Sequence, residues 1–426
     1  MMHPSGRAAA SPREAATGTP RGTTRRGLLL GAGAALAAAR PAQAQPRGPE
    51  LRIGAIYPAA GPLALPGDES FRGLELAVEA RNEAGGLLGR PLRLVKAEAN
   101  DAAQAGEAVR RLAGTERLVA LFGTTASPLS FAATQAAELA GMAYFELGAI
   151  ADTITARGFR YLFRSGPRAT DYAALGLRTA RETLPGLWGL PLAGLRIAIA
   201  HEDGLYGQSV AAAQEAGLQG GEAALLGRFA YAPGGQDLPA LVARLRSADA
   251  QLLLHTGQAQ EVLALFRAMK EAGWRPRMVL GSGGGYALAD TAQSLGPALE
   301  GVLNVGFPPY ASAGRLGEEA KRVAEAYRLK YGHDPRSAHS LANHAGARLF
   351  LDAIHRAGGT EREKLRGAVL ATELDTAEAP LGWAAAFDEA GQNQRARPVL
   401  SQWQGGRLVA VAPEGTALAA PRGEMG

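Results

Sequence analysis

The segment LRIGAIYPAAGPLALPGDESFRGLELAVEARNEAGGLLGRPLRLVKAEANDA, residues 51–102, decides the fold of this chain. It opens with a short apolar run at residues 51–57, which is typical of a buried strand. Apolar side chains then recur at helical spacing over residues 71–83, and Gly85-Gly86 closes that helix. A second strand is predicted over residues 92–97. A strand, a helix and a strand in this order predict a parallel crossover, in which the helix covers one face of the sheet.

The same alternation continues along the chain. Further strands are predicted at residues 118–122, 142–145, 196–200, 251–254 and 278–281. Further helices are predicted at residues 102–112, 129–140, 209–216 and 260–272. Short strands that alternate with longer helices predict an α/β protein with doubly wound parallel sheets, covered by helices on both faces. The roughly 380 residues that follow the first 44 favour two domains over one.

An export signal is predicted at residues 1–44. Arg25 and Arg26 precede a short apolar run that reaches Ala39, and an Ala-x-Ala sequence ends at Ala44. This pattern is typical of a twin-arginine signal peptide that is cleaved after Ala44. A membrane anchor is the alternative, but the run is shorter than the roughly 20 residues that span a bilayer. We therefore expect a periplasmic protein, with the general secretion route as the alternative to the twin-arginine route.

The basic charge of the chain belongs to this leader. The leader holds six of the 45 Lys and Arg residues and one of the 40 Asp and Glu residues, so the remainder carries 39 of each. This balance removes the main reason to expect binding to nucleic acid or to an anionic membrane. The chain has no cysteine, which excludes disulfides, thiolate metal sites and a lipid-modified cysteine. We expect a soluble monomer without a lipid anchor.

Six loops are the candidate ligand site. In open parallel sheets, ligands bind beyond the carboxyl ends of the strands, because helix N-termini and loop amides converge there. The predicted elements place the following loops at these ends: residues 59–69, 123–128, 146–152, 201–207, 256–260 and 281–286.

At these loops the chain resembles a known family, the periplasmic amino-acid-binding proteins of the leucine/isoleucine/valine type, which serve ABC importers. The similarity begins in segment 51–102 and continues in four further stretches. These are ALFGTTASPLSFAATQAAELAGMAYFELGAIADTIT (120–155), RIAIAHEDGLYGQSVAAA (196–213), LLLHTGQAQEVLALFRAMKEAGW (252–274) and PLGWAAAFDEAGQNQ (380–394). The resemblance covers nearly all of residues 51–412, and it rests on the order and spacing of these stretches.

The resemblance implies the type I periplasmic binding fold, a Venus flytrap of two doubly wound parallel-sheet lobes joined by three strand crossings. We place the crossings near Ser165, Gly306 and Asp375. The implied parts are lobe 1 at 51–165 plus 306–375, lobe 2 at 166–305 plus 376–412, and a C-terminal tail at 413–426. Closure of the lobes around a ligand is the expected motion.

Several residues match ligand-contacting positions of that family. Ser127, with Thr125 and the loop amides beside it, falls where the family holds the carboxylate of the ligand. The alternative for Ser127 is a helix cap before Pro128. Ala149 matches a position that contacts the ligand through backbone groups. Tyr206 matches a tyrosine that reaches the cleft from the second lobe, and core packing is its alternative.

Three positions depart from the family pattern: Ile150 stands where a threonine helps to hold the ligand ammonium, Gly283 where an acid pairs with it, and Gln258 where a large aromatic lines the wall. A buried ammonium without a carboxylate is unfavourable, so these departures argue against a simple α-amino acid. That argument fails if another acid takes over, and the candidates are Glu202, Asp203 and Glu146. We expect a small, largely apolar carboxylic acid or a modified amino acid, with branched-chain amino acids as the close alternative.

Other chemistry has little support. The glycines at 281–285 lack the Gly-Lys-Ser/Thr ending of a nucleotide loop. The spacing of His333, His339 and His344 does not match a metal site, and no Gly-x-Ser-x-Gly motif supports a nucleophilic serine. We therefore expect that the protein is not an enzyme and that it binds neither a cofactor nor a metal.

The expected function is that of an extracytoplasmic solute-binding protein, which captures a small ligand and delivers it to a membrane complex of permease and ATPase. The alternative is a sensor on the same fold that reports ligand occupancy to a membrane signalling partner. Neighbouring permease and ATPase genes would favour import, and a neighbouring histidine kinase gene would favour sensing.

Overall fold

The computed structural model describes residues 46–378 and 384–426. The export signal predicted at residues 1–44 lies outside these ranges. Within them, no helix is both long enough and apolar enough to cross a membrane.

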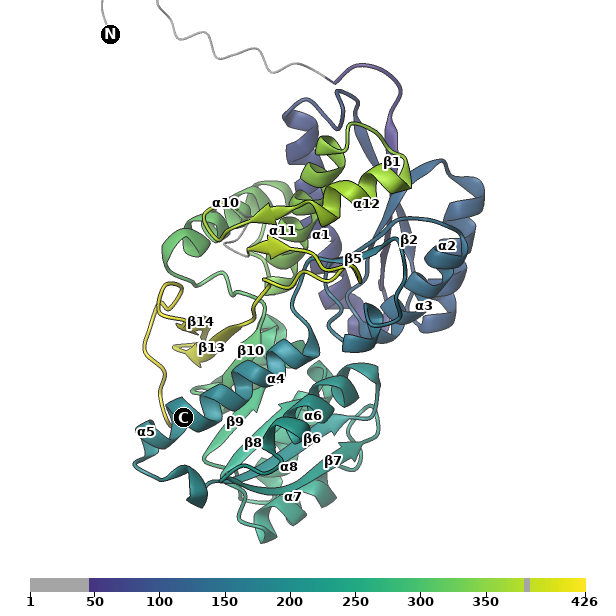
Figure 1. Ribbon diagram of the computed structural model, residues 1–426. Coiled ribbons are helices and arrows are strands. Elements are labelled where there is room, and N and C mark those ends of the chain that lie inside the picture. Colours follow the sequence, from purple (N-terminus) through teal and green to yellow (C-terminus); the bar gives the residue numbers. More distant parts are fainter. Residues whose placement is uncertain (1–45, 379–383) are drawn as a thin grey trace, which may run out of the picture. The chain divides into compact units, whose positions relative to one another are not determined.

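The first sheet contains only parallel strands (Figure 1). Its strands are β1 (Leu51–Tyr57), β2 (Leu92–Glu98), β3 (Leu118–Gly123), β4 (Tyr144–Glu146) and β5 (Leu162–Arg164), in the order β2-β1-β3-β4-β5. Helices α2 (Ala102–Thr115) and α3 (Ser127–Leu139) pack together over one core, and α1 (Ala64–Glu83) packs against α11 (Ala338–Arg356) over another. Ile56 belongs to the first of these cores, whereas Ala55 and Tyr57 belong to the second. Alternate side chains of β1 are thus buried on opposite faces, which explains its continuous apolar sequence.

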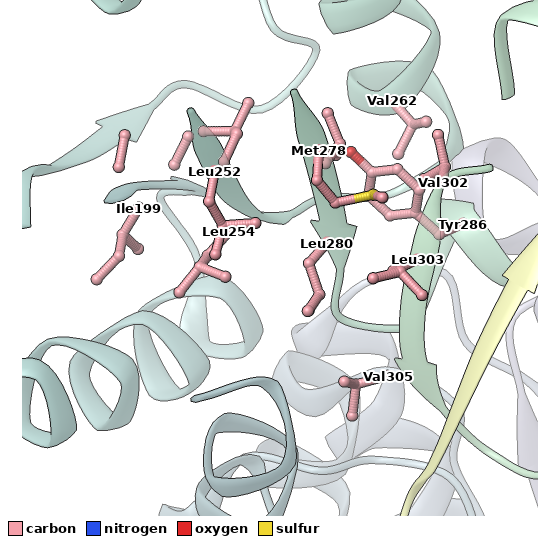
Figure 2. Close-up of a cluster of buried hydrophobic side chains, with 14 of the residues drawn as sticks. Ile199, Leu252, Leu254, Val262, Met278, Leu280, Tyr286, Val302, Leu303 and Val305 are labelled. Carbon is pink, nitrogen blue, oxygen red and sulfur yellow. The ribbon is translucent and has the colours of Figure 1, made fainter. Parts of the chain in front are cut away.

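The second sheet has the order β14-β13-β10-β9-β8-β6-β7. Its strands are β6 (Arg196–Glu202), β7 (Ala224–Tyr231), β8 (Leu252–Thr256), β9 (Met278–Gly281), β10 (Leu303–Gly306), β13 (Val399–Gln404) and β14 (Arg407–Ala412). Strands β6 to β10 are parallel, and β13 and β14 add an antiparallel edge beside β10. Figure 2 shows the core of this sheet, where Leu254 on β8, Leu280 on β9 and Leu303 on β10 are fully buried.

Helices cover the second sheet as well. They include α4 (Ala169–Arg178) and α6 (Leu205–Leu218), which pack together, and α7 (Leu238–Ser247) and α8 (Ala259–Glu271), which do the same. The remaining elements are the short helices α5 (Leu184–Trp188) and α9 (Ala289–Leu295), helices α10 (Gly314–Tyr331) and α12 (Arg362–Leu370), and the two-residue strands β11 (Glu373–Leu374) and β12 (Ala385–Ala386).

The doubly wound α/β prediction is confirmed, and the strands predicted at 51–57 and 278–281 coincide with β1 and β9. Helices α1 and α6 begin earlier than predicted, at Ala64 and Leu205. Position 67, in the first turn of α1, requires glycine, because a Cβ there would lie 2.2 Å from the Pro58 carbonyl oxygen. In the sequence, a glycine at this place indicates a turn, which is why the predicted helix began too late.

The chain passes between the two sheets in three places. It leaves β5 at Arg164 and enters α4, and it leaves β10 at Gly306. The third differs from the crossing expected near Asp375, because β12 pairs with β11 and Gln392 forms a bridge with Arg164 of the first sheet. Residues 385–393 thus stay beside the first sheet, and the chain reaches the second only at β13.

The C-terminal segment, expected as a tail at 413–426, packs against the second sheet. Met425 belongs to the hydrophobic core of that sheet, and the Trp188 indole donates to the carbonyl oxygen of Gly423. These contacts make the segment part of the folded body.

Candidate functional site

A cavity of about 350 Å³ lies at the carboxyl ends of strands from both sheets. All six loops predicted from the sequence contribute to it, as expected for parallel sheets. From the first-sheet loops come Ala60, Gly61, Pro62, Leu63, Pro66, Thr125, Ala126, Ser127, Pro128, Gly148 and Ile150. From the second-sheet loops come Glu202, Tyr206, Gln258, Ser282, Gly283 and Gly284. Residues outside the predicted loops complete it: Asn100, Tyr172, Pro233, Glu261, Ala287, Phe307 and His339.

The start of α3 forms one end of the cavity. The backbone N–H groups of Thr125 and Ala126 have no acceptor among the described residues. The Thr125 hydroxyl donates to Ser70 Oγ at 2.8 Å. Free amides at a helix N-terminus favour an anion, through both hydrogen bonding and the helix dipole. This end of the cavity can therefore hold a carboxylate.

Ser127 does not cap α3. It is the first residue of the helix, Ala126 occupies the cap position, and no side chain makes a capping bond there. The Ser127 hydroxyl oxygen instead accepts the backbone N–H of Ala151 at 3.2 Å. Because that bond uses a lone pair, the hydroxyl hydrogen is free to donate into the cavity.

Glu146 organises both loops on this side, but it does not line the cavity. Its Oε1 accepts the N–H groups of Gly148 and Ala149, each at 2.8 Å, and its Oε2 accepts the Thr124 N–H at 3.0 Å and the Ser130 hydroxyl. Complete burial raises the pKa of Glu146 to about 7, although the four hydrogen-bond donors lower it. Its oxygens are occupied inside the protein, so Glu146 does not replace the missing ammonium partner.

Ala149 also lies behind the cavity wall, contrary to the family position that it matches. Its N–H is held by Glu146, and its carbonyl oxygen accepts from Arg164 Nη1 at 3.3 Å. Both backbone groups are therefore used within the protein. Ile150, the next residue, does line the cavity with an apolar side chain.

Arg164 supports this loop from the crossing. Its fully buried guanidinium donates to the carbonyl oxygen of Ala151 at 2.8 Å, to Thr155 Oγ1 at 3.0 Å and to Gln392 Oε1 at 2.6 Å. Burial lowers the pKa of Arg164 to about 10. Since Ala151 in turn holds the Ser127 hydroxyl, Arg164 positions the anion end of the cavity indirectly.

On the second-sheet side, Tyr206 lines the cavity from the first turn of α6. It is 7% exposed, and its hydroxyl donates to the carbonyl oxygen of Ser282. Burial raises the pKa of this hydroxyl well above its ordinary value, so it stays protonated. Tyr206 thus packs and lines the cavity at once, and its oxygen can still accept a hydrogen bond.

The geometry of the loop after β9 favours glycine at position 283. Gly283 has φ of +73°, and its N–H donates to Asn304 Oδ1 at 2.8 Å. A side chain at this φ is strained, and a Cβ would lie 3.4 Å from the Tyr172 ring. Gln258 occupies the N-cap position of α8, half-buried at the cavity, with an amide that can both donate and accept.

Two carboxyl groups line the second-sheet side. Glu202, at the end of β6, accepts the N–H of Gly207 at 2.7 Å, and burial raises its pKa. Glu261, in the first turn of α8, is 6% exposed and was not predicted. Asp203, the third candidate acid on the sequence, is exposed and does not line the cavity. Glu202 and Glu261 therefore place two carboxyl groups at the second-sheet side of the cavity.

An aromatic wall connects the two sides. Phe307 packs edge-on against Tyr172, with ring centroids 6.4 Å apart, and against His339, at 5.6 Å. Burial lowers the pKa of His339 to about 4, so the ring is neutral at physiological pH. His333 and His344 lie away from the cavity. Among the described residues, no cluster of three or more His, Cys, Asp or Glu side chains could hold a metal ion.

Sequence reasoning missed these residues because none lies in a predicted loop. Tyr172 and His339 lie in helices that were not predicted, and Phe307 follows an unpredicted strand. For Glu261 a signal existed, because it stands in the first turn of a predicted helix, directly after loop 256–260.

Comparisons with known proteins agree with this architecture. The family model described as "Periplasmic binding protein" matches residues 50–406. The chain is 37% identical to Leu/Ile/Val-binding protein homolog 7 of Brucella suis over 392 residues, which are 92% of this chain and 97% of that protein.

Two solved structures share the fold. The branched-chain amino acid transporter substrate-binding protein LivJ from Streptococcus pneumoniae, in complex with isoleucine, has a TM-score of 0.72 at 17% identity and covers 86% of this chain and 100% of its own. An ABC transporter solute-binding protein from R. palustris, in complex with benzoate, has a TM-score of 0.71 at 20% identity, with coverage of 88% and 99%.

Proposed function

Because the chain belongs to the periplasmic binding protein family, among the Leu/Ile/Val-binding proteins, we propose that it is an extracytoplasmic receptor for a small carboxylate and hands this ligand to an ABC importer. The observation that carries the proposal is the cavity itself. One end presents the Ser127 hydroxyl and the free amides of Thr125 and Ala126, and the opposite wall comes from the second sheet. Its volume suits a small molecule.

The chemistry of the lining favours binding over catalysis. Among the residues that the structure describes, Ser127 Oγ is hydrogen-bonded to the Ala151 amide and to no general base, and His339 Nδ1 lies 2.6 Å from Ser337 Oγ. Apolar and aromatic side chains such as Ile150, Tyr172 and Phe307 surround the few polar groups, an arrangement typical of ligand pockets. A carboxylate with an apolar body fits such a site. Isoleucine and benzoate, the ligands of the two solved relatives, both have this form.

Hinged closure is part of the proposal. We assign lobe 1 to residues 51–165 and about 306–394, and lobe 2 to residues 166–305 and about 395–426. A ligand held by both lobes would stabilise the folded protein by about 2.7 kcal/mol at a hundredfold excess over its Kd. X-ray scattering should show a more compact particle with ligand. Tight binding with an unchanged particle would refute closure.

The test of function starts with a thermal-shift screen of the mature protein. The panel should contain amino acids, their deaminated and N-acylated analogues, and aromatic acids, with calorimetry on every hit. We expect at least one hit from this panel of carboxylates. A panel without any hit would overturn the proposal.

Uptake of a radiolabelled hit should then be compared between cells with and without the gene. Loss of uptake supports delivery to an importer. Normal uptake combined with a lost transcriptional response to the ligand would favour the sensor function instead.

A further inference from the structure

The carboxyl group of Glu261 is only half satisfied. Its Oε1 accepts the N–H of Gly234 at 2.8 Å, whereas its Oε2 is buried and has no hydrogen-bond partner among the described residues. The residue is 94% buried and lines the ligand cavity. A buried carboxylate oxygen without a donor is strongly unfavourable, so this arrangement requires an explanation.

A structural role in α8 does not explain it. An acidic residue in the first turn of a helix commonly bonds back to the cap residue, or complements the helix dipole. Here the cap is Gln258, and Glu261 reaches the loop after β7 instead of the cap N–H. That contact occupies one oxygen and leaves the other unused.

No protein cation compensates for the charge. The cavity is lined by Glu202 and Glu261, and its described lining contains neither lysine nor arginine. His339, the lining histidine, is neutral because burial lowers its pKa to about 4. Neither glutamate forms a salt bridge within the described residues. The second-sheet side is thus an acidic region that faces an anion-binding end at Ser127.

We propose that Glu261, assisted by Glu202, is the specificity-determining residue for a positively charged or N–H-rich group of the ligand. The ligand is then a carboxylic acid that also carries an amino, amidino or guanidino group, rather than a purely apolar acid. This inference rests on the proposed function. The terminal torsion of a glutamate side chain is soft, so a small rotation presents Oε2 to a ligand donor. Glu261 would then take the role of the protein acid that the backbone at Gly283 excludes.

The test uses matched pairs of probes on the mature protein. L-leucine is compared with 4-methylpentanoate, and 6-aminohexanoate with hexanoate, so that the amino group is either next to the carboxylate or at the far end. We expect the amino-bearing member of at least one pair to bind about tenfold to a hundredfold more tightly by calorimetry. Removing the donor leaves a buried carboxylate unpaired, which is why the preference is large.

Glu261→Gln should remove this preference. The expected result is a loss of about tenfold or more for the amino-bearing ligand, with affinity for the deaminated partner unchanged within about twofold. Glu271→Gln, an exposed acid at the far end of the same helix, should leave both affinities unchanged. If Glu261→Gln fails to fold, Glu202→Gln tests the same acidic side, and the probe pairs already test the proposal on the unaltered protein.

The outcomes separate the two proposals. Carboxylates that bind without any preference for the amino-bearing member overturn this inference and leave the receptor function intact. A preference that persists in Glu261→Gln and in Glu202→Gln overturns it as well. Failure of every carboxylate to bind overturns the proposed function, and the inference falls with it.

Discussion

The hydroxyl oxygen of Ser127 accepts the backbone N–H of Ala151 at 3.2 Å, and this bond couples the start of α3 to the loop after β4. It fixes the serine with its hydrogen available for a ligand. The same loop is held from behind by Glu146 and Arg164, so the anion end of the cavity depends on two buried side chains that do not line it.

Ser127→Ala should weaken binding of a carboxylate ligand by about 1.5–3 kcal/mol, because a hydrogen bond to a charged group is lost. Calorimetry with a hit from the screen measures this directly. Ser294→Ala serves as the control, since Ser294 is exposed and bonds only within α9 and its flank. Unchanged affinity in Ser127→Ala would mean that the carboxylate is held elsewhere.

Gly284→Ala should destabilise the fold and reduce affinity together. Gly284 has φ of +51°, and an added Cβ would lie 2.5 Å from the Gly257 carbonyl oxygen and 2.9 Å from the Tyr206 hydroxyl. Gly273→Ala is the matched control, because Gly273 has φ of +59° and open space around it. Urea unfolding should show a loss of about 1 kcal/mol for the control from φ alone, and a larger loss for Gly284→Ala. Ligand affinity should fall in Gly284→Ala only.

Export can be tested without the folded domain. Replacing Arg25 and Arg26 by lysine should leave the precursor in the cytoplasm if the twin-arginine route is used. Immunoblots of periplasmic and cytoplasmic fractions would show this, and N-terminal sequencing of the unaltered exported protein should begin at Gln45. Normal export of the double variant would indicate the general route. A retained Arg25 on the exported protein would refute cleavage.

The sequence predicts several central strands accurately. Buried parallel strands such as β1 and β9 are short, largely apolar runs flanked by polar or proline residues, so the sequence indicates where they begin and end. The loops at their carboxyl ends follow from topology, and Ser127, Tyr206 and Gln258 all line the cavity. Ala149 does not, because the decision between facing the cavity and facing Glu146 depends on backbone direction in a loop, which a sequence match does not specify.

The residues that were missed show the same limit. Glu261 belongs to the first turn of α8, and only the three-dimensional path of the loop after β7 brings the Gly234 N–H to one of its oxygens. His339 and Phe307 meet at the cavity although they are distant in sequence from the predicted loops. Ile150, Gly283 and Gln258 argue against an amino acid only if no other acid takes over, and Glu202 and Glu261 both line the cavity.

Arg164→Lys should lower the thermal stability strongly. The guanidinium spans several neutral acceptors at once, including Ala151, Thr155 and Gln392, and an ammonium group cannot reach all of them. Leaving two or more buried acceptors unpaired costs about 2–5 kcal/mol. Arg267→Lys, at an exposed position of α8, is the control. Calorimetric unfolding that shows no difference between the two variants would contradict the role assigned to Arg164.

The buried carboxyl group of Glu146 should make the free energy of unfolding depend on pH. Its pKa in the folded protein is raised from 4.5 to about 7 by burial, so the folded state binds this proton more tightly than the unfolded state. The contribution of Glu146 to the free energy of unfolding is therefore highest below about pH 4.5, falls as pH rises from there to about 7, and is constant above. Glu146→Gln cannot titrate. The stability advantage of the unaltered protein over Glu146→Gln should shrink between pH 5 and pH 8, by a few kcal/mol at most, at about 1.4 kcal/mol for each unit of pKa.

Urea unfolding of both proteins at pH 5 and pH 8 measures this difference, because other titrating groups cancel between them. The exposed Glu107 provides the control, since Glu107→Gln should follow the unaltered protein at both pH values. A second readout comes from the ligand. The N–H groups of Gly148 and Thr124 lose their ionic acceptor in Glu146→Gln, so the loops beside Ser127 should shift and carboxylate affinity should fall. If the advantage instead grows with pH, the four donors around Glu146 outweigh its burial, and its carboxylate is held ionised in the folded protein.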